Sequence, residues 1–216
     1  MVLDNQRSNF DPFILVVAKR FSGIHPNTIS WTSLLFALIA GLFFYFSSPE
    51  NELRTYFLFG ASFFVFLNGL FDAIDGKVAK MTNRSSKRGD FLDHALDRYA
   101  DVFMVGGLAL SGWVDLRIGL IAIIGMLLTS YMGTQSQAIG EKRDYSGLLG
   151  RADRLVLLMI APIVQHLLLL FYNYAQVFGL SILELVLIYF AIMGNITALQ
   201  RFFSTLRNLQ KKERTY

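Results

Sequence analysis

Cysteine is absent from this 216-residue chain, and proline occurs only four times. Without cysteine the protein has no disulfide, thiolate metal ligand or thiol nucleophile, so a metal site has to use oxygen or histidine ligands. No proline-rich or low-complexity run marks a linker, and no internal repeat of about 20 to 50 residues is visible. We therefore expect a single domain over residues 1–216.

Charged residues are also scarce, at 17% of the chain, whereas 54% is hydrophobic and 20 residues are phenylalanine. This composition exceeds what a soluble domain needs and predicts an all-α membrane protein. Stretches long enough to cross a bilayer as helices are found at 28–48, 54–80, 89–114, 117–139, 152–172 and 177–206. The shorter segment 11–21 combines an apolar body with Lys19 and Arg20, which predicts an amphipathic helix lying at the membrane interface.

Lysine and arginine are distributed unevenly between the two ends of these six spans. Of 20 basic residues, Arg54 and Arg117 alone fall on the side opposite the termini. The positive-inside rule therefore places both termini, and the loops after the second and fourth spans, in the cytoplasm of a multi-pass cell-membrane protein. A basic face of this kind favours anionic membrane lipids as partners, and the absence of any nucleic-acid motif argues against nucleic acid.

Four aspartates interrupt this apolar sequence. Asp72 and Asp75 stand three residues apart near the end of the second span, and Asp93 and Asp97 stand four apart near the start of the third. Each pair projects from one face of a helix, so a helical hairpin brings all four together close to the cytoplasmic surface. Ionised groups in a span are costly without a partner, and carboxylates alone favour Mg²⁺, with Mn²⁺ next. Four acids are enough to hold two ions.

Small residues accompany these acids. Gly76, Ala79 and Gly89 have little or no side chain, which permits either close approach of a ligand to the backbone or close packing of helices. Asn27 follows Pro26 at the start of the first span, where we expect it to be the N-cap.

The stretch from Asp72 to Asp97 resembles the motif D-x2-D-G-x2-A-R-x8-G-x3-D-x3-D of the CDP-alcohol phosphotransferase (phosphatidyltransferase) family, with Lys80 in place of the arginine. The resemblance implies transfer of a phosphoalkyl group from a CDP-linked lipid donor to an alcohol hydroxyl, with release of CMP. It also implies a homodimer. By position in the motif, the metal ligands are Asp72, Asp75 and Asp93, and Asp97 is the general base and a further metal ligand.

The same resemblance places several residues beside the nucleotide and its diphosphate, namely Asn27, Gly76, Ala79, Lys80 and Gly89. Lys80 keeps the positive charge of the family's arginine but lacks its bidentate fork, which affects how the diphosphate is held. Asp90 and Asp101 lie outside the motif, and we interpret them as surface or ion-pairing groups.

Further cations gather at the cytoplasmic edge of the later spans, namely Lys142, Arg151, Arg154 and Arg201. They are either part of the ordinary positive-inside bias or the binding site of an acceptor phosphate, since two arginines three residues apart can hold one phosphate. The run Gly-Leu-Leu-Gly-Arg151-Ala-Asp-Arg154-Leu and the pair Gln200-Arg201 are similar to the branch that makes phosphoinositol lipids from inositol phosphate, including its archaeal members. Inositol phosphate is therefore the expected acceptor, with glycerol phosphate or serine as alternatives.

Two other classes of protein use acidic clusters in membranes. Intramembrane prenyltransferases carry two separated Asp-rich motifs, whereas here one hairpin holds all four acids. A divalent-cation transporter tends to bind its ion near the bilayer midplane, whereas these acids lie at one edge. Both observations favour the phosphotransferase.

Overall fold

The computed structural model describes residues 7–142, 144–172, 176–177 and 179–213, and throughout these residues the regular structure is helical apart from a bridge between Val177 and Leu180. The helices are α1 (Arg7–Arg20), α2 (Pro26–Phe46), α3 (Glu52–Thr55), α4 (Phe57–Met81), α5 (Lys87–Ala109), α6 (Leu116–Ala138), α7 (Arg151–Tyr172) and α8 (Ile182–Glu213).

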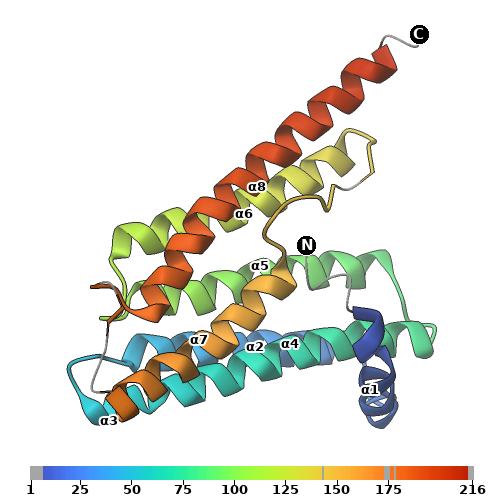
Figure 1. The fold of residues 1–216 in the computed structure, drawn as a ribbon. Coiled ribbons are helices and arrows are strands. Elements are labelled where there is room, and N and C mark those ends of the chain that lie inside the picture. Colours follow the sequence, from blue (N-terminus) through green and yellow to red (C-terminus); the bar gives the residue numbers. More distant parts are fainter. Residues whose placement is uncertain (1–6, 143, 173–175, 178, 214–216) are drawn as a thin grey trace.

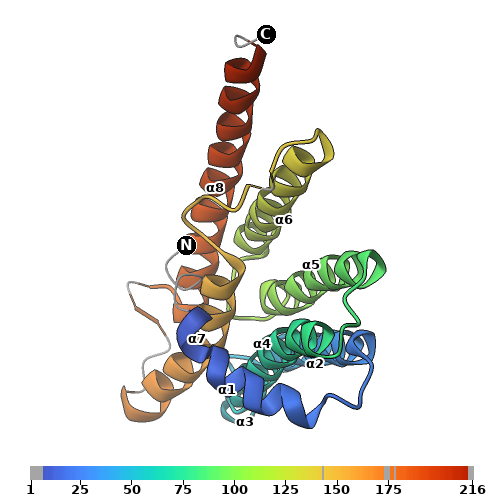
Figure 2. The same ribbon diagram turned by 90° about the vertical axis from the view of Figure 1, so that its right-hand side faces the viewer.

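The helices form two groups joined by α7. In one group α2 packs between α4 and α5, and in the other α6 packs along α8 (Figures 1 and 2). α7 contacts both α4 and α8, and α5 also contacts α6. The hairpin of α4 and α5 therefore lies against α2 on one side and near the start of α7 on the other.

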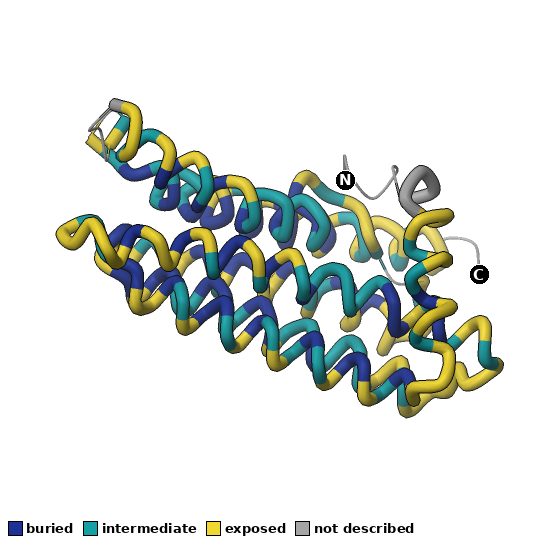
Figure 3. The backbone as a smooth tube through the Cα atoms, turned by 90° about the horizontal axis from the view of Figure 1, so that it is seen from below, coloured by how far each residue is buried: buried dark blue, intermediate teal, exposed yellow. Residues whose placement is uncertain are grey.

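Among the residues that the structure describes, five helical segments are long and apolar enough to cross a membrane, namely α2, the stretch Glu52–Met81, α6, α7 and α8. Exposed residues recur along the outer sides of the helices (Figure 3). Many large apolar residues are exposed, for example Phe63, Leu120 and Ile192, as expected where lipid replaces water. The protein is thus a multi-pass membrane protein.

Two of the predicted spans differ from the observed helices. α8 begins at Ile182, not at residue 177, and it continues beyond residue 206 to Glu213. The predicted third span corresponds to α5, which is not among the five apolar segments because charged residues recur through its first 15 residues, from Lys87 to Asp101.

The start of α2 corrects one prediction. The N-cap is His25, whose Nδ1 accepts a hydrogen bond from the Asn27 N–H at 3.2 Å, so Asn27 is not the cap. The reason is Pro26: proline suits the first helical position, where no N–H is needed, and so the helix begins one residue before Asn27. The Asn27 side chain is left available for other contacts.

Glycine permits close approach between helices at several places, two of which show the effect clearly. A Cβ at Gly107 on α5 would meet the backbone of Gly41 on α2, and a Cβ at Gly125 on α6 would meet Asn195 on α8. Polar contacts reinforce the packing: Asn68 on α4 donates to the Ser33 carbonyl on α2 at 3.0 Å, and Thr129 donates to the Gly194 carbonyl at 2.8 Å. The contacts at Gly107 and Asn68 fix α5 and α4 against α2 beside the acids, and those at Gly125 and Thr129 fix α6 against α8.

Candidate active site

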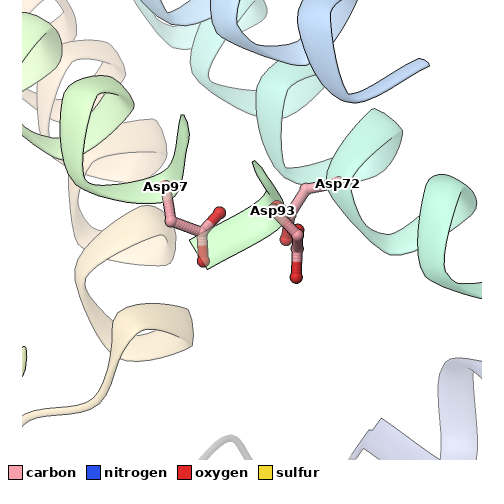
Figure 4. Close-up of side chains that lie close together, drawn as sticks. All are labelled: Asp72, Asp93 and Asp97. Atoms are coloured by element: carbon pink, nitrogen blue, oxygen red, sulfur yellow. The ribbon is translucent and has the colours of Figure 1, made fainter. Parts of the chain in front are cut away.

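Three of the four aspartates form a compact group. Asp72 comes from α4, Asp93 and Asp97 come from α5, and each offers a carboxylate oxygen within 4.8 Å of the others (Figure 4). All three side chains are partly buried. They lie toward the ends of α4 and α5 that the sequence predicts to face the cytoplasm. Like charges at this separation repel one another, so the group needs a cation. Carboxylate oxygens of this kind suit a hard divalent ion.

Asp75 lies beside this group and lines the same small cavity. It is 4% exposed, and its Oδ2 accepts a hydrogen bond from Ser30 Oγ at 2.5 Å. Its position is set by α2, because the Ser30 hydroxyl fixes the carboxylate. Ser33 and Asn68, which bond to each other one turn deeper, line the cavity as well.

Arg151 places a cation against the acids. It is the first residue of α7, and its Nη1 lies 2.7 Å from Asp72 Oδ2 while its Nη2 lies 2.9 Å from Asp97 Oδ1. The arginine thus neutralises part of the negative charge and joins α4, α5 and α7 at the cavity. A cation that binds these acids has to compete with this guanidinium.

The other three predicted acceptor-binding residues do not line the cavity as the described residues define it. Arg154 is buried on α7, with Nη2 3.1 Å from Asp101 Oδ2. Arg201 is buried on α8 and donates to the carbonyls of Ser146 and Thr129 at 2.9 and 2.6 Å. Lys142 is exposed in the loop before α7. Arg151 alone of the four lines the cavity, as far as the described residues define it.

The loop between α6 and α7 is held against α8. Thr197 Oγ1 accepts hydrogen bonds from the Leu148 and Leu149 N–H groups, each at 3.2 Å. Within the loop, partial burial by itself raises the pKa of Asp144, but hydrogen bonds from Ser146 and Ser204 and the nearby Arg201 charge together bring it below its ordinary value. The start of α7, and with it Arg151, is positioned by these contacts.

The residues predicted to lie beside the nucleotide surround the same end of the hairpin. A Cβ at Gly76 would meet nothing within 4 Å, so this glycine is not required for helix packing within the chain. A Cβ at Gly89 would lie 3.6 Å from Asn27 Oδ1, which brings the start of α2 beside the start of α5. Ala79 is half-buried and Lys80 is exposed one turn beyond Gly76.

Ser30 was not predicted from the sequence as a residue of the site, and Asp101 was predicted only as a surface or ion-pairing group. Asp101 is 3% exposed and lies in a cluster of arginines, so of the two earlier interpretations ion pairing applies and surface exposure does not. Its spacing gives a usable signal, because residues 93, 97 and 101 recur every four positions and so share one helical face. Ser30 has no such signal, because its partner Asp75 is 45 residues away.

Comparisons with known proteins identify relatives of this chain. The model of the CDP-alcohol phosphatidyltransferase family matches residues 23–199. An archaetidylinositol phosphate synthase of Pyrococcus horikoshii is 29% identical over 141 residues, which are 65% of this chain and 70% of the relative. A phosphatidylinositol phosphate synthase of Streptomyces avermitilis is 30% identical over 69% of this chain, and the match spans 60% of that relative's length.

The fold is also found among solved structures. The Mycobacterium tuberculosis phosphatidylinositol phosphate synthase with CDP-DAG bound aligns with a TM-score of 0.70 and 20% identity, over 89% of this chain and 92% of the other. The same enzyme with manganese and citrate aligns with a TM-score of 0.71. Since the family model covers the acidic hairpin, α7 and most of α8, neither a prenyltransferase nor a cation transporter describes this chain. It is a transferase, a member of the CDP-alcohol phosphatidyltransferase family.

Proposed function

We propose that this protein transfers a phosphatidyl-type group from a CDP-linked lipid to the hydroxyl of inositol phosphate, with Mg²⁺ as cofactor and CMP as the product. The observation that carries the proposal is the contact of Arg151 with Asp72 and Asp97. It puts an arginine that can bind an anionic phosphate directly beside two carboxylates that can bind a cation. The names of the relatives from Pyrococcus and Streptomyces support inositol phosphate as the acceptor.

The residues present fit a divalent cation. Asp72, Asp93 and Asp97 supply oxygen ligands within reach of one another, and the guanidinium of Arg151 shows that this position attracts positive charge. Asp75, held by Ser30, is the fourth ligand, so that two Mg²⁺ ions, or Mn²⁺ in their place, share the four acids. When bound, such ions neutralise a diphosphate and stabilise the leaving oxygen. The manganese in the Mycobacterium tuberculosis structure supports this choice.

The donor occupies the open side of the hairpin. Gly76 leaves room for it, and Ala79, Gly89 and the Asn27 side chain line the approach. Lys80 attracts the diphosphate with the compact charge of its ammonium group, without the bidentate hydrogen bonds of an arginine. The bound CDP-DAG of the structural relative supports a CDP-linked lipid in this role.

Asp97 acts as the general base. It removes the proton from the acceptor hydroxyl, whose oxygen then forms a bond to the phosphorus that carries the lipid. The bond from that phosphorus to the bridging oxygen breaks, and CMP leaves with the electron pair. Because Arg151 Nη2 lies 2.9 Å from Asp97, the arginine has to release this carboxylate before it can accept the proton.

The acceptor phosphate is held by Arg151, with Arg154, Arg201 and Lys142 forming the rest of its site. Arg151 already lies in the cavity, so it makes the closest contact. Arg154 forms an ion pair with Asp101 and Arg201 donates to backbone carbonyls in this conformation, and a guanidinium has five N–H donors with which to bind a phosphate as well. Lys142, exposed on the loop, adds a long-range positive charge.

In the membrane, we propose six spans, with α5 as the additional one. α5 has 23 residues, and at about 1.5 Å per residue it is long enough to cross a hydrocarbon core of about 30 Å. α1 runs across the end of α4, joined to it by the Asp11–Lys77 ion pair at 3.0 Å, which suits a helix lying at the interface (Figure 1). The whole chain is then one domain, homodimeric, with termini and active site cytoplasmic.

Orientation is tested by introducing single cysteines into this cysteine-free chain. An impermeant thiol reagent applied to intact cells should label Glu50→Cys, in the loop between α2 and α3, and should leave Arg84→Cys unlabelled until the cells are opened. The reverse pattern would move the active site to the outer face.

The activity is tested by following CMP release from purified protein, a CDP-linked lipid and a panel of acceptors. Inositol phosphate should be the best acceptor, ahead of glycerol phosphate, serine and free inositol, and release should require Mg²⁺ or Mn²⁺. Replacing Asp72, Asp75 or Asp93 by asparagine should abolish turnover, because each loss removes a ligand from an oxygen-only site. Asp90→Asn, at an exposed acid on the same helix as Asp93, is the matched control. Full turnover in the presence of a chelator would refute the metal requirement.

A further inference from the structure

Asp101 is a buried acid that the family motif leaves out. It lies one helical turn after Asp97 on α5 and is 3% exposed. Its Oδ2 is 3.1 Å from Arg154 Nη2 and 3.2 Å from Arg98 Nη1, and its Oδ1 is 3.8 Å from Arg151 Nε. One carboxylate therefore faces three guanidinium groups.

This carboxylate lies outside the group of acids that can hold a metal ion. As far as the described residues show, Asp101 is neither in that group nor in the lining of the cavity. Desolvating a buried carboxylate costs free energy, and close ion pairs have to offset that cost. Its partners on α7 are both residues of the acceptor site, so its negative charge acts on Arg151 and Arg154.

The three contacts of Arg151 divide its guanidinium into two edges. The Nη atoms face Asp72 and Asp97, whereas Nε faces Asp101. When Asp97 is needed as a base, the Nη atoms have to exchange a carboxylate for another anion. The Nε contact, an ion pair at 3.8 Å and not a hydrogen bond, involves neither Asp72 nor Asp97, so its attraction for the arginine persists during the exchange.

We propose that Asp101 is a positioning residue for the acceptor phosphate. It fixes Arg154 and the Nε edge of Arg151, so that the two guanidinium groups present their remaining N–H donors to one phosphate. The inference rests on the proposed function, since it requires a phosphorylated acceptor. A purely structural Asp101 would stabilise the contact between α5 and α7 without affecting which substrate binds.

The test is steady-state kinetics of Asp101→Asn with CDP-lipid and inositol phosphate, varied separately. Because asparagine keeps the shape but loses the charge, the acceptor KM should rise by about ten-fold or more, the effect of losing one charge-assisted bond. The donor KM and the affinity for Mn²⁺ should change less than about two-fold. Asp90→Asn, whose side chain is 74% exposed, controls for the change in net charge on α5.

A double-mutant cycle with Arg154→Gln tests whether Asp101 acts through the arginine. If it does, the two substitutions should be less than additive: the rise in acceptor KM of the double variant should be smaller than the product of the two single rises, because Arg154→Gln already loses the part of the effect that passes through Arg154. The double variant also removes one charge of each sign, so it avoids a buried unpaired guanidinium and remains measurable if Asp101→Asn alone does not fold. Additive effects in this cycle would overturn the inference.

The same measurements distinguish a wrong role for Asp101 from a wrong acceptor. If the wild type transfers to inositol phosphate but Asp101→Asn changes donor and acceptor KM equally, or neither, the role of Asp101 is refuted and the proposed function stands. If the wild type transfers only to unphosphorylated alcohols, both are refuted.

Discussion

Replacing Arg151 by glutamine should increase the affinity of the acid cluster for Mn²⁺ while weakening acceptor binding. The guanidinium lies 2.7 Å from Asp72 and 2.9 Å from Asp97, where it competes with an incoming ion for the same oxygens. Glutamine keeps a polar, uncharged amide at about the position of the arginine Cδ and Nε, so it removes both the charge and the Nη contacts. The two effects of the substitution have opposite signs, which no general loss of structure would produce.

The magnitude follows from the contacts that the ion has to displace. A unit charge about 5 Å from a divalent ion costs roughly 6 kcal/mol at an effective dielectric constant of about 20, which is an upper limit because the wild-type arginine can turn away. When the arginine turns away, it gives up a charge-assisted hydrogen bond worth about 1.5–3 kcal/mol. The Mn²⁺ dissociation constant should therefore fall by about 10- to 100-fold.

Electron paramagnetic resonance of free Mn²⁺, titrated into protein in detergent without nucleotide, measures this constant directly. Arg88→Gln is the matched control, because Arg88 is exposed on the first turn of α5 and its loss changes the net charge equally. An unchanged or weaker Mn²⁺ affinity in Arg151→Gln would refute the competition between this arginine and the metal.

Three further outcomes are expected. Asp97→Asn should retain binding of the CDP donor while losing CMP release, measured by nucleotide titration and turnover, because a base acts on the acceptor proton; equal loss of both would make Asp97 chiefly a ligand. Gly76→Ala should stabilise the fold by about 0.5–1 kcal/mol yet raise the donor KM, whereas Gly107→Ala, whose Cβ would meet the Gly41 backbone, should lower the melting temperature. Folding lowers the pKa of Asp144, so the ionised carboxylate stabilises the fold at pH values above its unfolded pKa of about 3.9. This stabilisation is lost as the pH falls through the lower folded pKa. The difference in melting temperature between wild type and Asp144→Asn should therefore shrink below about pH 4.

The sequence by itself determined the membrane class and most of the spans. The length and hydropathy of a segment are local properties, and the predicted spans 28–48, 54–80, 117–139 and 152–172 correspond to α2, the stretch Glu52–Met81, α6 and α7 within a few residues. The grouping of acids was also accessible, because helical spacing puts Asp93 and Asp97 on one face and a short turn returns the chain to Asp72.

Helix ends were less predictable where two cap signals compete. Either His25 or Asn27 can accept the first free N–H of α2, and only the position of Pro26 in the first turn decided for His25. In α5, the charges that serve the site lower the hydropathy of the helix, so the same residues that indicate function conceal the span.

The pairing between helices was decided by the tertiary structure alone. Arg151 meets Asp72 across 79 residues of sequence, Ser30 meets Asp75 across 45, and Asp101 turns toward α7 and not toward solvent. Such contacts depend on how α2, α4, α5 and α7 cross, and the crossing is set by close approach at residues such as Gly41 and Gly107. Local spacing shows which face of a helix a residue occupies, but the neighbour of that face is determined by the packing of the whole bundle.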